Sequence, residues 1–196
     1  TRGALGSNRS AHNNGVVVTD AKNFTGWGVE TTTSQVILEP ANWSLDNFGQ
    51  FLVGVHYDTG TLVEWQLGSS AVAAPVTNAP LNNLGLVVTE ERFIFLLGAG
   101  GDPRKVQWCD KEANTVWTPA ATNEAGDFTL QTTGQIMQGL NTRGQTLIIT
   151  DSDAFSAKYL GPPYVYGFDR VGTSCGAVSR MSAVDTDLGA FWMGQK

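Results

Sequence analysis

The chain has 196 residues, of which 41% are hydrophobic and 15% charged, and its formal net charge is −6. This length and apolar content suit one domain with a real core and exclude a disordered polymer. The 12 Lys and Arg residues, against 18 Asp and Glu residues, do not make the basic surface of a dedicated nucleic-acid binder. No run approaches the ~18 apolar residues of a membrane-spanning helix. So few charges favour either a subunit that packs its neutral surface against neighbours or a Thr/Asn/Gly-rich β-protein.

Residues 1–30 show little periodicity and no candidate core, beginning with the polar run Thr1–Ser10. We predict an extended arm or linker for this region. An arm that packs on a neighbouring subunit and a frayed terminus are both compatible with it.

Residues 31–196 contain an internal repeat. Short apolar runs recur at residues 51–53, 93–95, 146–148 and 190–192, and each has a strand-like stretch before it, at residues 36–38, 86–88, 136–137 and 183–184. After the first three runs, Trp65, Trp108 and Tyr159 follow at a nearly constant distance. Repeats of about 40–50 residues with several short strands are typical of β-propeller blades.

We therefore predict an all-β fold of β-propeller-like blades, each a small antiparallel sheet, with about three and a half units and a truncated last blade. A generic sandwich with evenly spaced strands is the alternative. Large rings between blades would remove much apolar surface from water. The expected blade aromatics are Trp65, Trp108, Trp117, Tyr159 and Trp192. Three explanations are open for the incomplete last blade: a fragment of a longer protein, completion by the N-terminal segment, or strands from a neighbouring chain. We favour the fragment, because an open edge strand would otherwise need covering.

Residues that could carry chemistry have structural explanations. Cys109 and Cys175 are too few for a disulfide framework or a zinc site, so we expect two buried free thiols. His12 and His56 have no metal-like spacing. Residues 98–105 resemble a phosphate loop only superficially, because Pro103 and a strand follow where a helix would have to begin. We predict a hairpin turn there.

Two pairs of acids stand close together in the sequence, Asp151 with Asp153 and Asp185 with Asp187. A calcium loop needs further oxygen ligands and a glycine at fixed positions, which neither pair has. Glycosidase chemistry needs two carboxylates across a cleft, but acids between strands are usually solvated turn caps, which we expect here. We assign no catalytic residue, no metal site and no cofactor, and we expect no enzymatic activity.

An ordered set of motifs resembles a known family. The motifs are Trp43–Gly49, Glu64–Trp65, Val87–Arg92, Gly98–Asp102, Val106–Asp110, Trp117–Pro119, Ala125–Asp127, Tyr159–Pro163 and Cys175–Ala177. Their order and spacing from about residue 40 to the end are similar to those of propeller-type structural proteins of tailed bacteriophages and prophages.

The resemblance implies a virion component, in the tail or the nozzle through which DNA leaves, assembled in the host cytoplasm with other virion subunits. We expect a homo-oligomeric ring without a membrane span, and the acidic balance would let DNA pass without sticking. A receptor- or glycan-binding propeller is the alternative, and it predicts exposed tryptophans on one face, such as Trp27, Trp43 or Trp117. A polysaccharide-acting enzyme would instead bring acids and arginines together, among Arg92, Arg104, Arg143, Arg170 and Arg180.

Overall fold

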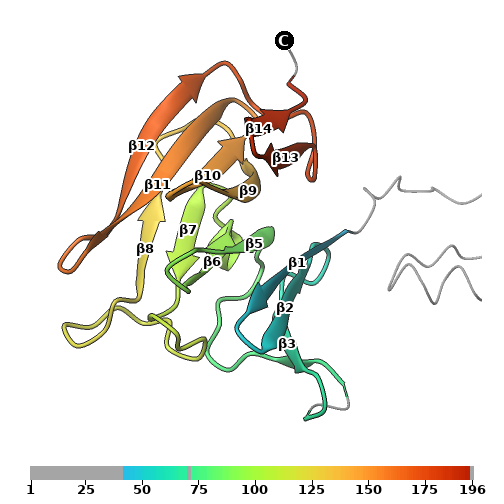
Figure 1. Cartoon of the computed structure of the whole chain (residues 1–196), viewed down its shortest axis with the longest axis vertical. Helices are drawn as coiled ribbons and strands as arrows, with labels where there is room; N and C mark the ends of the chain where they lie inside the picture. The colour runs from blue at the N-terminus through green and yellow to red at the C-terminus, as the bar shows by residue number, and fades with distance from the viewer. Residues whose placement is uncertain (1–41, 70–71, 195–196) are drawn as a thin grey trace, which may run out of the picture. The chain divides into compact units, whose positions relative to one another are not determined.

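The computed structural model describes residues 42–69 and 72–194, and these residues form an all-β structure (Figure 1). They contain fourteen strands and one short 3-10 turn, Ala99–Gly101, but no α-helix. The predicted all-β class is confirmed. No helix in this part of the chain is long and apolar enough to cross a membrane.

The strands form four antiparallel sheets in which neighbouring strands follow one another in the chain. Sheet 1 comprises β1 (Trp43–Phe48), β2 (Phe51–His56), β3 (Leu62–Gln66) and β4 (Ala74–Pro75). Sheet 2 comprises β5 (Gly85–Val88), β6 (Ile94–Leu97), β7 (Lys105–Trp108) and β8 (Gly126–Thr129). Sheet 3 comprises β9 (Ile136–Thr142), β10 (Gln145–Thr150), β11 (Asp153–Gly161) and β12 (Val165–Thr173), and sheet 4 comprises β13 (Ala183–Thr186) and β14 (Gly189–Trp192). Three four-stranded sheets and one two-stranded sheet match the expected three and a half units.

The recurring apolar runs correspond to the second strand of each sheet, namely β2, β6, β10 and β14. Trp65, Trp108 and Tyr159 lie on the third strands β3, β7 and β11. One expectation needs correction: the first strand of sheet 1 is Trp43–Phe48, directly before β2, and residues 36–38 lie outside the described part of the chain. A tight turn at Gly49 explains the short connection, because Gly49 has φ 64°, in the left-handed region that glycine tolerates.

Each pair of consecutive sheets shares a hydrophobic core. Strand β6 illustrates this, because its side chains alternate between two cores. Ile94 and Leu96 lie in the core with sheet 1, whereas Phe95 and Leu97 lie in the core with sheet 3. Strand β10 does the same, with Ile148 in the core with sheet 2 and Ile149 in the core with sheet 4. Sheets 2 and 3 are therefore buried on both faces, which explains the continuous apolar runs Ile94–Leu97 in β6 and Leu147–Ile149 within β10.

The first strands of the sheets lie next to one another, and polar side chains join them. From β1, Ser44 Oγ donates to Leu86 O (3.0 Å) and accepts from Leu86 N (3.1 Å), and Asp46 Oδ2 accepts from Val88 N at 2.8 Å. From β9, Asn141 Nδ2 donates to Val88 O. These bonds satisfy backbone groups of β5 that no strand of its own sheet can reach.

The contacts divide the chain at Asn42, and the described sheets all belong to the unit that begins at Trp43. The predicted arm of residues 1–30, and its boundary with the blades at residue 31, lie outside the described residues and stay predictions.

Candidate functional site

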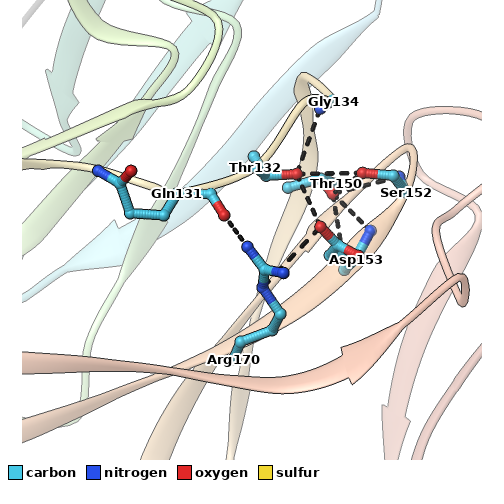
Figure 2. Close-up of polar contacts among 7 residues, drawn as sticks. All are labelled: Gln131, Thr132, Gly134, Thr150, Ser152, Asp153 and Arg170. Atoms are coloured by element: carbon cyan, nitrogen blue, oxygen red, sulfur yellow. Dashed lines mark hydrogen bonds and ion pairs between the residues drawn. The ribbon is translucent and has the colours of Figure 1, made fainter.

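A group of polar contacts surrounds the turn between β10 and β11, where Asp151 and Ser152 connect the strands (Figure 2). Thr150 organises this turn through its hydroxyl. Its Oγ1 accepts from the backbone N–H groups of Ser152 (3.2 Å) and Asp153 (2.7 Å) and donates to Asp153 O at 2.9 Å. Thr150 is fully buried, so these bonds satisfy groups that water cannot reach.

The segment between β8 and β9 is bound to this turn through Thr132. Its Oγ1 donates to Asp153 Oδ2 at 2.9 Å, accepts from Gly134 N at 3.2 Å and lies 3.1 Å from Ser152 Oγ. A Cβ on Gly134 would collide with the carboxylate of Asp151, so a larger residue here would force that side chain to move. The group therefore holds the segment that follows sheet 2 against one end of sheet 3.

Arg170 on β12 completes the group from the opposite side of Asp153 (Figure 2). Its Nε lies 4.0 Å from Asp153 Oδ2, its Nη2 donates to Gln131 O, and its guanidinium lies 5.4 Å from the centre of the Phe155 ring. The Asp153 side chain is only 13% exposed. The expectation of a solvated cap is wrong for Asp153, because Thr132 and Arg170 reach it from segments that are remote in sequence.

This arrangement does not provide nucleophilic chemistry. A serine needs a general base within hydrogen-bond reach, and Ser152 Oγ has only the hydroxyls of Thr132 and Thr150 as side-chain neighbours among the described contacts. The carboxylates of Asp151 and Asp153 both bind protein groups. Asp151 Oδ1 accepts from Gln135 N at 3.2 Å, and Asp153 Oδ2 accepts from Thr132 Oγ1 at 2.9 Å. The described residues contain no group of three His, Cys, Asp or Glu side chains that could hold a metal. The cluster holds the β10–β11 turn against β12 and against the segment before β9.

The second acid pair behaves as expected, because Asp185 and Asp187 are exposed at the β13–β14 turn. They line an open hollow of about 350 Å³ together with Arg143 and Trp192. Arg143 Nη2 donates to the backbone oxygen of Asp187 at 2.8 Å, so it is bound to the turn. The five arginines considered for an enzyme are separated, each with its own local contacts.

Four of the five expected blade aromatics lie in or against the cores between sheets. Trp108 and Tyr159 lie at the core of sheets 2 and 3, Trp117 at that of sheets 1 and 2, and Trp192 at that of sheets 3 and 4. Each indole N–H of these tryptophans donates to a backbone oxygen, as in the 2.8 Å bond from Trp108 to Glu124 O. Trp65 differs, because it belongs to none of the three cores.

Two tyrosine–glutamate pairs border the core of sheets 2 and 3. Tyr159 donates to Glu124 Oε2 at 2.9 Å, and Tyr166 contacts both Glu91 Oε2 (3.1 Å) and Thr89 Oγ1 (2.9 Å). Burial, followed by the nearby carboxylate of Glu91, raises the pKa of Tyr166 above its usual value. The bond to Glu124 raises the pKa of Tyr159. Both phenols therefore stay protonated and act as hydrogen-bond donors that join the two sheets.

The thiols are free, but they differ. Cys109 is buried, and burial raises its pKa to about 12, whereas Cys175 is half-buried, which corrects the expectation that both are buried.

His56 is 3% exposed and lies beneath the Trp43 ring, with 4.9 Å between the ring centres. His12 lies outside the described residues.

Sheet 1 has an apolar face that the sequence patterns did not predict and that no other described sheet covers. Side chains of sheet 1 that point away from sheet 2 include Trp43, Leu45 and Leu52, which are 43%, 57% and 39% exposed. Trp65 pairs with Leu52 and Val63 with Gly54, so both lie on this same side. We call Trp43, Leu45, Leu52, Val63 and Trp65 the outer face of sheet 1. Alternation along β1 and β3 could have revealed it, because both sides of these strands carry apolar residues.

Sheet 4 has a smaller uncovered face. Ala183, Ala190 and Trp192 point toward sheet 3, so Val184 and Phe191 point away from it, and both are 56% exposed. We call Val184 and Phe191 the outer face of sheet 4.

No protein-family model matches the chain, and a search of curated proteins found no significant match.

Proposed function

We propose that the chain is a non-enzymatic structural component of a tailed-phage virion, a tail or nozzle subunit built from β-propeller-like blades. The observation that carries this proposal is the succession of four sheets in which every inner sheet is buried on both faces while the outer faces of sheets 1 and 4 remain apolar. Such faces mark surfaces that pack against further protein.

The contacts around the β10–β11 turn support a structural role rather than a catalytic one. This polar cluster uses its hydroxyls, Asp153 and Arg170 to hold strands together. The proposal of a phage particle rests on the ordered motifs between Trp43 and Ala177. The low charge would suit a subunit surrounded by others, and the acidic balance would suit DNA passage.

A receptor- or glycan-binding module has less support. That role calls for exposed tryptophans with polar partners, but Trp117 is 2% exposed, in the core of sheets 1 and 2. Trp43 is exposed, yet it lies on the outer face of sheet 1 among apolar side chains. Trp27 lies outside the described residues.

The test is the composition of the particle. Particles made by the host that encodes this chain would be purified on a density gradient and analysed by quantitative mass spectrometry, and an antibody against the chain would locate it by electron microscopy. We expect the chain in intact particles, in several copies at the tail. Its absence from particles, with the protein found only free in the lysate, would overturn the proposal.

A further inference from the structure

A second hollow lies where the β2–β3 turn of sheet 1 meets the segment that leads into sheet 2. Tyr57, Asp58 and Gly60 of the turn line it, together with Asn82 and Asn83 from the segment before β5. Its volume is about 340 Å³. Ligand sites have volumes of roughly 300–1,000 Å³, so the hollow is large enough for a small molecule.

The walls of this hollow are held in place by backbone contacts. Asn83 N donates to Gly60 O at 2.9 Å, and Gly60 N donates to His56 O at 2.8 Å. Gly60 has φ 60°, and a Cβ there would lie 2.5 Å from the Asn82 backbone, so only glycine lets the turn and the segment approach this closely. The hollow is therefore formed before any ligand arrives, which lowers the entropic cost of binding.

One buried oxygen in the wall has no hydrogen-bond partner among the described residues. Asn83 is 1% exposed, and this oxygen is its Oδ1. The Nδ2 of the same amide donates to Gly60 O at 2.7 Å and to Pro80 O at 2.6 Å. The amide cannot turn over, because Oδ1 would then face two carbonyl oxygens. A buried acceptor left unpaired is destabilising, and a hydroxyl that enters the hollow would supply the missing donor.

Two opposite charges flank the hollow without forming an ion pair with each other. Asp58 is exposed, and its carboxylate forms no ion pair within the described part of the chain. The guanidinium of Arg180, from the segment between β12 and β13, lies 4.1 Å from the centre of the Tyr57 ring, and its Nη1 donates to Leu84 O at 3.5 Å. Tyr57 and Leu84 both line the hollow, so they fix Arg180 at its edge with further N–H groups available.

We propose that this hollow binds a neutral saccharide. Sugar hydroxyls both donate and accept, so one sugar can donate to Asn83 Oδ1 and to Asp58 and accept from Arg180. A carboxylate or phosphate has no proton to donate and is repelled by Asp58, and a cation is repelled by Arg180. An apolar ligand would leave all three groups without partners. The site goes beyond the proposed structural role and involves none of the tryptophans expected for a glycan-binding module.

NMR titration of the full, ¹⁵N-labelled chain tests the site. Glucose, galactose, mannose and N-acetylglucosamine would be added separately, with glucuronate and glucosamine as charged comparisons. We expect at least one neutral sugar to bind with a Kd of about 1 mM, since the hollow is open to water. It should shift the backbone amide signals of Asp58, Gly60 and Asn83, and the charged sugars should bind at least fivefold more weakly.

Three results of this titration would overturn the proposal. They are no binding of any neutral sugar, charged sugars that bind as tightly as neutral ones, and signal shifts confined to the other hollow beside Arg143 and Trp192.

Two substitutions at the rim test the residues. Asp58→Ala removes the carboxylate, and Asn82→Gly removes an exposed side chain at φ 56°, which glycine adopts freely. Each should weaken sugar binding at least fivefold. Asp185→Ala is the matched control, because Asp185 is an exposed acid of the other hollow, and it should leave the Kd unchanged. An equal loss in Asp58→Ala and Asp185→Ala, or no loss in either rim variant, would contradict the assignment.

Sugar binding and particle composition are measured separately. A chain that is found in virions but binds no sugar would leave the proposed function standing. A chain that binds sugar but is absent from particles would leave the saccharide site standing, so the two failures are distinguishable.

Discussion

Gln138 binds the backbone of Ala183 with both ends of its side-chain amide. Its Nε2 donates to Ala183 O at 3.0 Å, and its Oε1 accepts from Ala183 N at 3.0 Å. Gln138 lies on β9 and Ala183 begins β13, so one side chain pairs with the next sheet as a strand would. β9 is the edge strand of sheet 3, with β10 on its other side, so Gln138 joins this edge to the first strand of sheet 4.

Replacing the Gln138 amide should destabilise the contact between sheets 3 and 4. Gln138→Ala leaves the buried N–H and C=O of Ala183 without partners, which costs about 1–3 kcal/mol per group left unpaired. We expect urea unfolding to show a lower free energy of unfolding by at least this single-group cost. Gln131→Ala is the matched control, because Gln131 is exposed and surface changes usually stay within about 0.5 kcal/mol. Equal losses in both variants would show that the amide contributes nothing specific.

The core of sheets 2 and 3 should dominate stability. Phe95 is fully buried and contacts Trp108, Tyr166 and Phe168. Phe95→Ala removes these contacts and leaves a cavity, so we expect a loss of about 3–5 kcal/mol in the free energy of unfolding. Leu188→Ala, at a position 91% exposed, should change it by less than about 0.5 kcal/mol. A small effect at Phe95 would contradict the burial described here.

Removing the Thr132 hydroxyl should lower the free energy of unfolding even though the side chain keeps its shape. Thr132→Val keeps the shape but removes the donor to Asp153 and the acceptor for Gly134 N. We expect a destabilisation of about 1–3 kcal/mol, measured by thermal or urea unfolding. Thr129→Val on β8 is the control, since the Thr129 side chain makes no described hydrogen bond and is half-buried. If Thr132→Val and Thr129→Val are equally destabilised, the hydrogen bonds around Asp153 do not contribute to stability.

Cys109 should make stability fall at alkaline pH. Its folded pKa is raised to about 12 from 9.0, so the unfolded chain loses the thiol proton first. The stability that the protonated thiol contributes is fully present below pH 9, decreases as the pH rises above 9 and is lost by about pH 12. Cys109→Ala should flatten the decrease between pH 8 and 10 in urea unfolding curves, and the difference between the two proteins isolates the thiol because both carry the same tyrosines. Identical curves for the two proteins would contradict the predicted burial effect.

Local patterns determined much of the fold. Short alternating runs between glycine-containing turns located the second and third strands of the sheets, because strand formation depends on near neighbours and a side-chain period of two. The same patterns did not find the first strand of sheet 1, Trp43–Phe48, because Ser44, Asp46 and Asn47 interrupt its apolar residues. The resemblance to phage structural proteins also came from the sequence alone and stays a prediction.

Tertiary structure decided which side chains meet. Trp65 and Trp108 occupy equivalent strands, yet Trp108 is buried between sheets while Trp65 lies on an uncovered face. Asp153 looked like a solvated turn acid until the fold brought Thr132 and Arg170 to it. The physical reason is that alternation predicts two faces for each strand, but only the packing of one sheet on the next determines what each face contacts.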